Sequence, residues 1–190
     1  MESLQDKVPS NWSANGQFIL YNSTDPQTIT DLWVLPLEGD RKPWVFLKTG
    51  FIERDGQFSP DGRWVAYGSN ESGKFEVYVR PFPGLGAKRQ ISTAGGGEPQ
   101  WRRDGKELFY LSLDNKIMAV SVNADSTFHA GSPVALFAVH PSSSFYGTSY
   151  DASPDGQKFL INSVSADQGS PPLSLMIHWP ALLEKNGRDR

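Results

Sequence analysis

The sequence predicts an all-β chain built from a repeated unit, and three features support that prediction. The 190 residues include 18 glycines and 14 prolines, and 12% are aromatic, as expected for many short strands joined by tight turns. A turn containing Asp-Gly or Asn-Gly recurs four times. The runs that follow two of these turns, at 18–21 and 64–67, do not alternate apolar with polar residues. Both faces of those strands must therefore be buried.

Composition excludes several classes of partner and chemistry. The formal net charge is −3 with the two signs interspersed, which is not the basic footprint of a nucleic-acid or anionic-membrane binder. The absence of cysteine excludes disulfides, a thiolate nucleophile and a cysteine zinc site. No apolar run reaches the length of a membrane span, and 1–10 lacks the apolar core of a signal peptide. We expect no nucleic-acid partner, no membrane insertion by this chain, no cofactor and no metal.

The repeat defines the architecture. Segments 12–21, 58–67, 101–110 and 152–161 align on a shared glycine. These glycines follow one another at intervals of about 43 to 51 residues, enough for four short strands, which is one blade of a β-propeller. In each turn an Asp or Asn side chain can accept nearby backbone N–H bonds, and glycine takes the positive φ. The residues predicted to have this structural role are Asn15, Gly16, Asp61, Gly62, Asp104, Gly105, Asp155 and Gly156.

Each unit is expected to hold four strands. The first ends at the turn and the second begins after it. Third strands are predicted at 32–35, 75–79, 116–121 and 173–177, and outer fourth strands at 44–47, 88–91 and 134–137. The blades would span about 9–48, 56–92, 98–138 and 149–179 of one propeller domain, 1–190. Helix is expected only as one short turn at 180–185, where a proline opens the segment.

The fourth unit lacks a predicted outer strand. Only 4–8 could complete it from the other end of the chain, and that segment is short and polar. Three outcomes stay open: a weakly closed ring, two chains that complete each other, or part of a larger ring. Unpaired strand edges promote association, so we predict a homodimer or larger assembly through the blade edges.

The turns resemble the TolB-type, WD40-like (PD40) propeller repeat across about 9–179. Four segments carry a closer resemblance to the C-terminal sensor propeller of bacterial serine/threonine protein kinases, and 178–183 resembles that family's terminus. They are Asp31-Leu-Trp-Val-Leu-Pro-Leu-Glu-Gly39, Phe58-Ser-Pro-Asp-Gly-Arg-Trp-Val-Ala-Tyr67, Glu76-Val-Tyr-Val-Arg-Pro-Phe-Pro-Gly84 and Trp101-Arg-Arg-Asp-Gly-Lys-Glu-Leu-Phe-Tyr110. The resemblance implies an extracytoplasmic (periplasmic) sensor. The chain contains none of the kinase motifs, so phosphoryl transfer is not expected of it.

Catalysis has little support in the residues, and we predict no catalytic residues and no enzyme activity. No Gly-x-Ser-x-Gly elbow is present, and His129, His140 and His178 fit no triad-like local pattern. The repeated aspartates lie about one blade apart, so each is expected to serve its own turn rather than a shared metal. The glycines at 95–97 lack the Lys-Ser/Thr and the helix of a phosphate-binding loop.

Binding is the function that a propeller scaffold favours. The loops that join an outer strand to the next first strand, at 49–55, 93–98 and 140–150, are expected to gather at one mouth of the central channel. The candidate ligand-binding residues are Glu53, Arg54, Glu98, Tyr146 and Tyr150, with Phe145 beside them. Charge mixed with aromatic rings suits a protein or peptide partner. Alternatively, Glu53 and Arg54 brace their turns and the tyrosines cap the core.

The sequence therefore predicts a non-catalytic recognition or sensor module that binds a protein, peptide or small ligand at the channel mouth. One alternative is the gating propeller of a prolyl-oligopeptidase-like serine peptidase, whose hydrolase motif does not occur in this chain. Another is a TolB-like structural interaction scaffold. All three share one fold, so the fold alone does not separate them.

Overall fold

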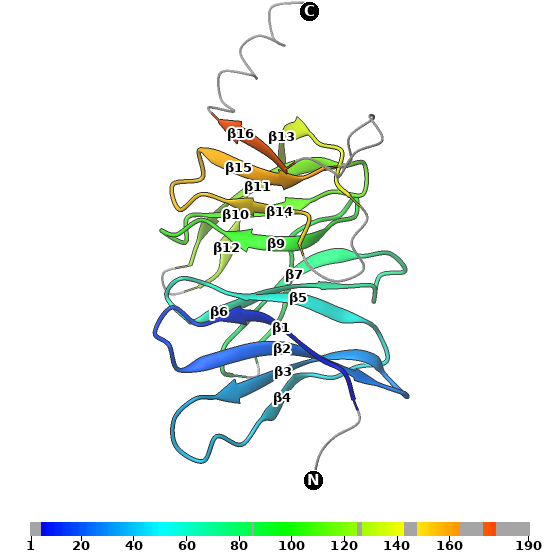
Figure 1. The fold of residues 1–190 in the computed structure, drawn as a ribbon, viewed down its shortest axis with the longest axis vertical. Coiled ribbons are helices and arrows are strands. Elements are labelled where there is room, and N and C mark those ends of the chain that lie inside the picture. Colours follow the sequence, from blue (N-terminus) through cyan, green and yellow to red (C-terminus); the bar gives the residue numbers. More distant parts are fainter. Residues whose placement is uncertain (1–4, 85, 125–126, 143–147, 164–172, 178–190) are drawn as a thin grey trace, which may run out of the picture. The chain divides into compact units, whose positions relative to one another are not determined.

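A computed structural model describes residues 5–84, 86–124, 127–142, 148–163 and 173–177, and the statements below concern these residues. Within them the secondary structure is β-strand, with no helix, as Figure 1 shows. The predicted all-β class is confirmed. The helical turn expected at 180–185 lies outside the described residues.

The strands form four separate antiparallel sheets (Figure 1). The first contains, in order, β1 (Lys7–Trp12), β2 (Phe18–Asp25), β3 (Ile29–Pro36) and β4 (Trp44–Leu47). The second contains β5 (Glu53–Phe58), β6 (Trp64–Ser69), β7 (Glu76–Pro81) and β8 (Arg89–Gln90). The third contains β9 (Gly97–Trp101), β10 (Glu107–Leu111), β11 (Lys116–Asn123), β12 (His129–Ala130) and β13 (Val134–Ala138), the last two both pairing with β11. The fourth contains β14 (Tyr150–Ala152), β15 (Lys158–Asn162) and β16 (Leu173–Ile177).

This arrangement is that of an incomplete β-propeller. Most strands pair with their neighbours in the sequence, except that β13 pairs with β11, and the fourth sheet has three strands among the residues described. Several strands differ from the prediction in their bounds: β3 covers Ile29–Pro36 rather than 32–35, and β11 continues to Asn123 rather than 121. The outer strand of the second sheet is shorter than the expected 88–91, and β12 adds a two-residue ribbon to one end of β11 that was not predicted.

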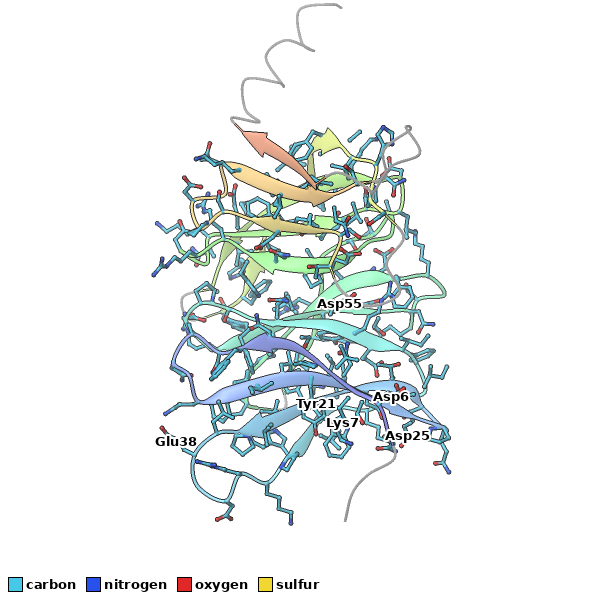
Figure 2. All side chains as sticks on the ribbon, viewed as in Figure 1. Asp6, Lys7, Tyr21, Asp25, Glu38 and Asp55 are labelled. Atoms are coloured by element: carbon cyan, nitrogen blue, oxygen red, sulfur yellow. The ribbon has the colours of Figure 1, made fainter. Side chains whose placement is uncertain are left out.

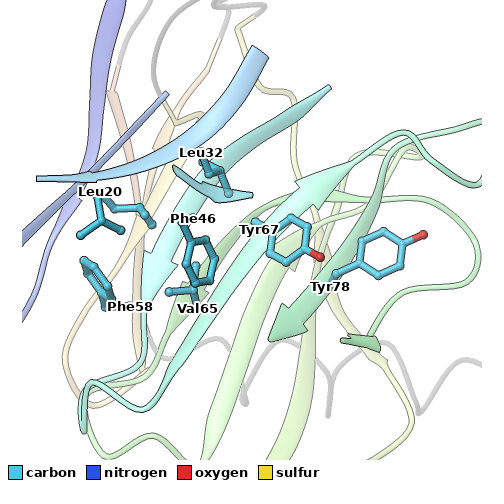
Figure 3. Close-up of a cluster of buried hydrophobic side chains, with 8 residues drawn as sticks. Leu20, Leu32, Phe46, Phe58, Val65, Tyr67 and Tyr78 are labelled. Carbon is cyan, nitrogen blue, oxygen red and sulfur yellow. The ribbon is translucent and has the colours of Figure 1, made fainter. Parts of the chain in front are cut away.

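The chain divides into two compact units, Met1–Pro99 and Gln100–Arg190, and each has its own core. In the first unit, Leu20, Leu32 and Val34 pack against Phe58 and Val65 of the second sheet (Figure 3). In the second unit a core cluster gathers the following buried side chains: Phe109, Ile117, Ala119, Leu136, Val139, Tyr150, Phe159 and Ile161. Strand β6 is buried continuously from Val65 to Ser69, as its unbroken apolar run requires.

The recurring turn has the same hydrogen bonds in the first, second and fourth sequence repeats. At Ser59–Arg63 the Ser59 hydroxyl donates to Asp61 Oδ1 (2.5 Å), which also accepts the backbone N–H of Arg63 (3.0 Å). Gly62 closes the turn at φ 69°, a value that favours glycine. Asn15 accepts the same pair of bonds in the first unit. In the fourth unit, hydrogen bonds from Ser153 and the N–H of Gln157 lower the pKa of Asp155.

Replacing Asp61 with alanine is expected to destabilise the fold by about 1 kcal/mol, because two donors lose one shared acceptor. Asp61→Asn keeps the Oδ1 acceptor, as Asn15 does, and should stay close to wild type. Urea unfolding of both variants measures the difference. Equal losses would mean that the charge, rather than the acceptor oxygen, matters at this turn.

Candidate functional site

The predicted binding residues are distributed over both compact units. Glu53, Arg54 and Glu98 belong to the first unit and Tyr150 to the second. Tyr146 lies outside the described residues, as does Phe145. Glu53, Arg54 and Glu98 thus lie in one compact unit, apart in the sequence from Tyr150 in the other.

Glu53 is a buried carboxyl at the start of β5. It is 0% exposed, and its Oε1 accepts hydrogen bonds from the hydroxyls of Thr49 (2.5 Å) and Ser69 (3.4 Å). Its Oε2 has no hydrogen-bond partner among the described residues. Burial raises its pKa to about 7 against the lowering effect of the Thr49 bond, and the charge of Asp31 adds to the rise. Glu53 thus supports the loop from inside and does not present its carboxyl at the surface.

Asp31, at the third residue of β3, is the buried carboxyl whose charge reaches Glu53. It is 1% exposed, and its Oδ2 accepts a bond from Thr28 (2.7 Å) and lies 3.6 Å from the Lys48 ammonium. Its Oδ1 has no partner among the residues the structure describes. Asp31 was not a predicted site residue, because an acid at the start of a third strand reads in the sequence as an ordinary strand end.

Arg54, the next residue on β5, presents a cation to solvent. Its side chain is 45% exposed, and its guanidinium lies over the ring of Phe75 at 4.1 Å. Its Nε is 3.3 Å from the carboxylate of Asp55. The ring and the carboxylate orient the guanidinium at the surface, where its N–H groups can donate hydrogen bonds to an anionic or carbonyl group.

Asp55 and Glu98 form an acidic pair on the first strands of two successive sheets (Figure 2 labels Asp55). Both have left-handed backbones, at φ 56° and 53°, which are uncommon outside glycine. Burial raises the pKa of Asp55 to about 6 against the opposing effect of Arg54, and the charge of Glu98 raises it further. The two carboxyls therefore lie close enough to repel each other. Asp55 and Glu98 lie the same number of residues before the turn glycines Gly62 and Gly105. An alignment of the repeats would therefore have shown an acidic residue at this position in both.

Tyr150 begins β14 and is 3% exposed. Its ring lies 6.3 Å from that of Phe159 within the core of the second unit, and its carbonyl accepts a bond from the Gln100 amide (2.7 Å). These contacts match the alternative in which the tyrosine caps the core.

The described ranges of the chain also show where the histidines lie and whether a metal site is present. His129 and His140 are exposed on the surface of the second unit, and His178 lies outside those ranges. No group of three or more acidic or histidine side chains there could hold a metal ion. The described residues contain no helix that is long and apolar enough to cross a membrane.

Comparison with known proteins identifies the class of fold. No family model matches the chain. The solved structure of TolB from Acinetobacter baumannii superimposes with a TM-score of 0.72 at 19% identity, over 92% of this chain and 41% of that one. A TolB-like protein of Agrobacterium tumefaciens gives 0.67 at 25% identity, over 93% and 63%. The chain therefore has the β-propeller fold of these TolB-like structures.

Two curated proteins are similar in sequence. An uncharacterized protein of Agrobacterium fabrum is 29% identical over 163 residues, 83% of this chain and 51% of that protein. Tricorn protease homolog 1 of Streptomyces coelicolor is 32% identical over 99 residues, 50% of this chain and 8% of that protein. The chain thus spans about half of one relative and a small part of the other.

Proposed function

We propose that the chain is a non-catalytic recognition module that binds a protein or peptide partner through a basic side chain of that partner. The supporting observation is the acidic pair, Asp55 and Glu98, at one repeat position on successive first strands. Burial is the main cause of the raised pKa of Asp55, and repulsion by the charge of Glu98 adds to the rise. A guanidinium or ammonium placed between them would remove that repulsion and gain two charge-assisted hydrogen bonds.

Arg54 supplies the second half of the proposed contact. Its exposed guanidinium, held over Phe75, is suited to a backbone carbonyl or a carboxylate beside the partner's basic residue. A rigid scaffold limits the entropy lost on binding, because these groups lie on or beside strands that are already paired. Glu53 supports this surface from beneath, through Thr49 and Ser69.

The resemblance to the sensor propeller of bacterial kinases gives this binding a proposed context. In that role the propeller lies outside the cytoplasm and reports a bound ligand to a kinase on the same chain. The TolB-like fold supports the scaffold on which such a sensor depends. The compartment and the kinase connection rest on the resemblance alone.

The binding proposal predicts a specific loss of affinity. A fluorescein-labelled, arginine-rich peptide should bind the chain, and Asp55→Asn with Glu98→Gln should weaken binding by about tenfold, equivalent to about 1.4 kcal/mol. Fluorescence anisotropy at moderate ionic strength measures this. The matched control, Glu38→Gln with Asp40→Asn, removes the same charge from an exposed loop of the first sheet. If both double variants lose affinity equally, the acidic pair is not the contact, and net charge explains the binding.

A second candidate function has one observation in its favour. The similarity to Tricorn protease homolog 1 is compatible with a propeller that accompanies a peptidase domain. The coding sequence beside this chain separates the two functions. A following Gly-x-Ser-x-Gly segment with Asp and His would indicate the gating propeller, and a preceding kinase and membrane span would indicate the sensor.

We also propose that the chain self-associates, because the fourth sheet has only three strands within the part of the chain that the structure describes. Both partner binding and self-association are compatible with a purely structural scaffold. That alternative predicts that partners captured by the wild-type chain are captured equally by the variant lacking the acidic pair.

A further inference from the structure

The first sheet has an apolar face directed away from the core of its unit. Cross-strand register places Trp12, Ile19 and Leu35 in one row, and Tyr21, Trp33 and Val45 in the next. Residues opposite each other on neighbouring strands share a face, so these six form one surface, called here the β1–β4 outer face. The alternate positions, such as Leu20 and Val34, face the core. Trp12 is 61% exposed and Val45 41%, whereas Tyr21 is buried, at 8%, so the exposed apolar groups of this face are at Trp12 and Val45.

The fourth sheet also has one exposed face. Along β15, Phe159 and Ile161 are buried in the core of the second unit, whereas Lys158 and Leu160 are exposed. Leu160 is 40% exposed and lies opposite Asp151 of β14, which is exposed as well. Strand β6, by contrast, is buried on both faces. The first and fourth sheets therefore each have an exposed face that β6 lacks.

A recurring hydrogen bond joins the first strands of adjacent sheets. Asn11 on β1 accepts the backbone N–H of Phe58 on β5 through its Oδ1 (3.0 Å). Gln100 on β9 accepts the backbone N–H of Ala152 on β14 through its Oε1 (3.3 Å). The acceptors Asn11 and Gln100 occupy one repeat position, two residues before the serine or arginine that begins the turn. The donors Phe58 and Ala152 share another repeat position, one residue before the turn serine. We call this bond the inner-strand bond.

Both halves of a further inner-strand bond are present at the two ends of the repeat. Asp151 occupies the acceptor position, and its side chain is exposed. Trp12 occupies the donor position. Because Ser13 N bonds Phe18 O, and successive N–H groups of a strand point to opposite edges, the Trp12 N–H points away from β2. The edge strand β1 thus presents the backbone N–H of Trp12 as a donor from which an Asp151 carboxylate could accept a hydrogen bond.

We propose that a second copy of this chain docks head to tail, with the exposed face of its β14–β16 sheet on the β1–β4 outer face. In this contact the carboxylate of the second copy's Asp151 accepts the backbone N–H of the first copy's Trp12, and the second copy's Leu160 packs among the exposed apolar groups of the β1–β4 outer face. The second copy is the occupant because it carries both the apolar surface and the acceptor that the repeat uses at this position. The inference rests on the self-association proposed above and is independent of the acidic pair.

Sedimentation velocity on the full chain at about 50 µM, a concentration suited to weak association, tests this contact. Wild type should sediment as a dimer or larger species. Trp12→Glu blocks one face and Leu160→Glu the other, so each variant alone should be monomeric. An equimolar mixture of the two should form a heterodimer, because each supplies the face that the other lacks. Leu113→Glu, at a residue 59% exposed on a hairpin of the third sheet, is the control and should behave as wild type.

Several results would overturn the proposal. A monomeric wild type at this concentration would do so, as would a dimer of Leu160→Glu alone, which would indicate a symmetric contact between two β1–β4 outer faces. A mixture that stays monomeric would exclude the head-to-tail pairing. The acceptor has its own test: Asp151→Asn keeps an acceptor like Asn11 and should associate as wild type, whereas Asp151→Ala should weaken association several-fold. In every case far-UV circular dichroism and the urea midpoint of the variant check that the chain is folded, whether or not the acidic pair binds a peptide.

Discussion

Replacing Phe159 with alanine is expected to lower the free energy of unfolding by about 3–5 kcal/mol, one of the largest effects in the chain. The ring is 0% exposed and is enclosed by other aromatic rings, with centroids at 5.1 Å from Phe109 and 5.3 Å from Phe137. Truncation removes these edge-to-face contacts and leaves a cavity that β-sheet neighbours cannot readily fill. The midpoint of urea unfolding, followed by tryptophan fluorescence at low micromolar concentration, measures the loss.

Leu160→Ala is the matched control for this prediction. Leu160 is the next residue of β15 but lies on the opposite, exposed face, so its truncation should cost under about 1 kcal/mol. Similar losses for both variants would contradict the assignment of Phe159 to the core and of Leu160 to the surface. Because β15 alternates so regularly, this pair of variants also tests its register against β14 and β16.

The strands could be predicted because their determinants are local. The turn residues fix the position of each first hairpin, and the apolar runs after them fix which segments are buried. The outer strands were predicted less exactly, because neither a turn motif nor a long apolar run marks them. Strand β8 covers only Arg89–Gln90, although Ile91 beside it is buried and donates to Val77 O. Strand β12 has two exposed residues and no pattern by which the sequence could reveal it.

The site was less predictable because it depends on contacts between distant segments. Glu53 was predicted as a ligand-binding residue, with bracing of its turn as the alternative. In the structure its carboxyl is buried, accepts bonds from Thr49 and from Ser69 on β6, and is reached by the charge of Asp31 on β3. Asp55 was missed because a left-handed backbone at an aspartate has no signature in a single sequence. Arg54 was predicted as a ligand-binding residue, and that role stays a prediction; its orientation over Phe75 could not be read from the sequence.

Replacing Glu53 with glutamine is expected to stabilise the fold at about pH 8 and to have little effect near pH 4. The folded-state pKa of about 7 lies above the ordinary value of 4.5, so the folded chain holds a proton that the unfolded chain has released between these values. Stability from this group is therefore full at low pH and falls as pH rises through that window. At about 1.4 kcal/mol per pKa unit, the charged carboxyl costs on the order of 3 kcal/mol above pH 7. The glutamine avoids this cost, and thermal unfolding across pH 4–8 should show a gain of about 1–3 kcal/mol at the upper end.

Glu76→Gln should act in the opposite direction, although the two glutamates are equally buried and lie on either side of Ser69 in one register. The carboxylate of Glu76 accepts bonds from the Ser92 hydroxyl and from the N–H of Gly95 (2.9 and 3.0 Å), and lies 3.4 Å from the Lys74 ammonium. An uncharged amide weakens these charge-assisted bonds, so this variant should lose stability at pH 8. If Glu76→Gln instead raised the free energy of unfolding at pH 8 as much as Glu53→Gln, burial alone would determine how much a charged carboxylate destabilises this sheet. Opposite signs would show that the partners decide it, because one carboxylate has donors at both oxygens and the other has them at only one.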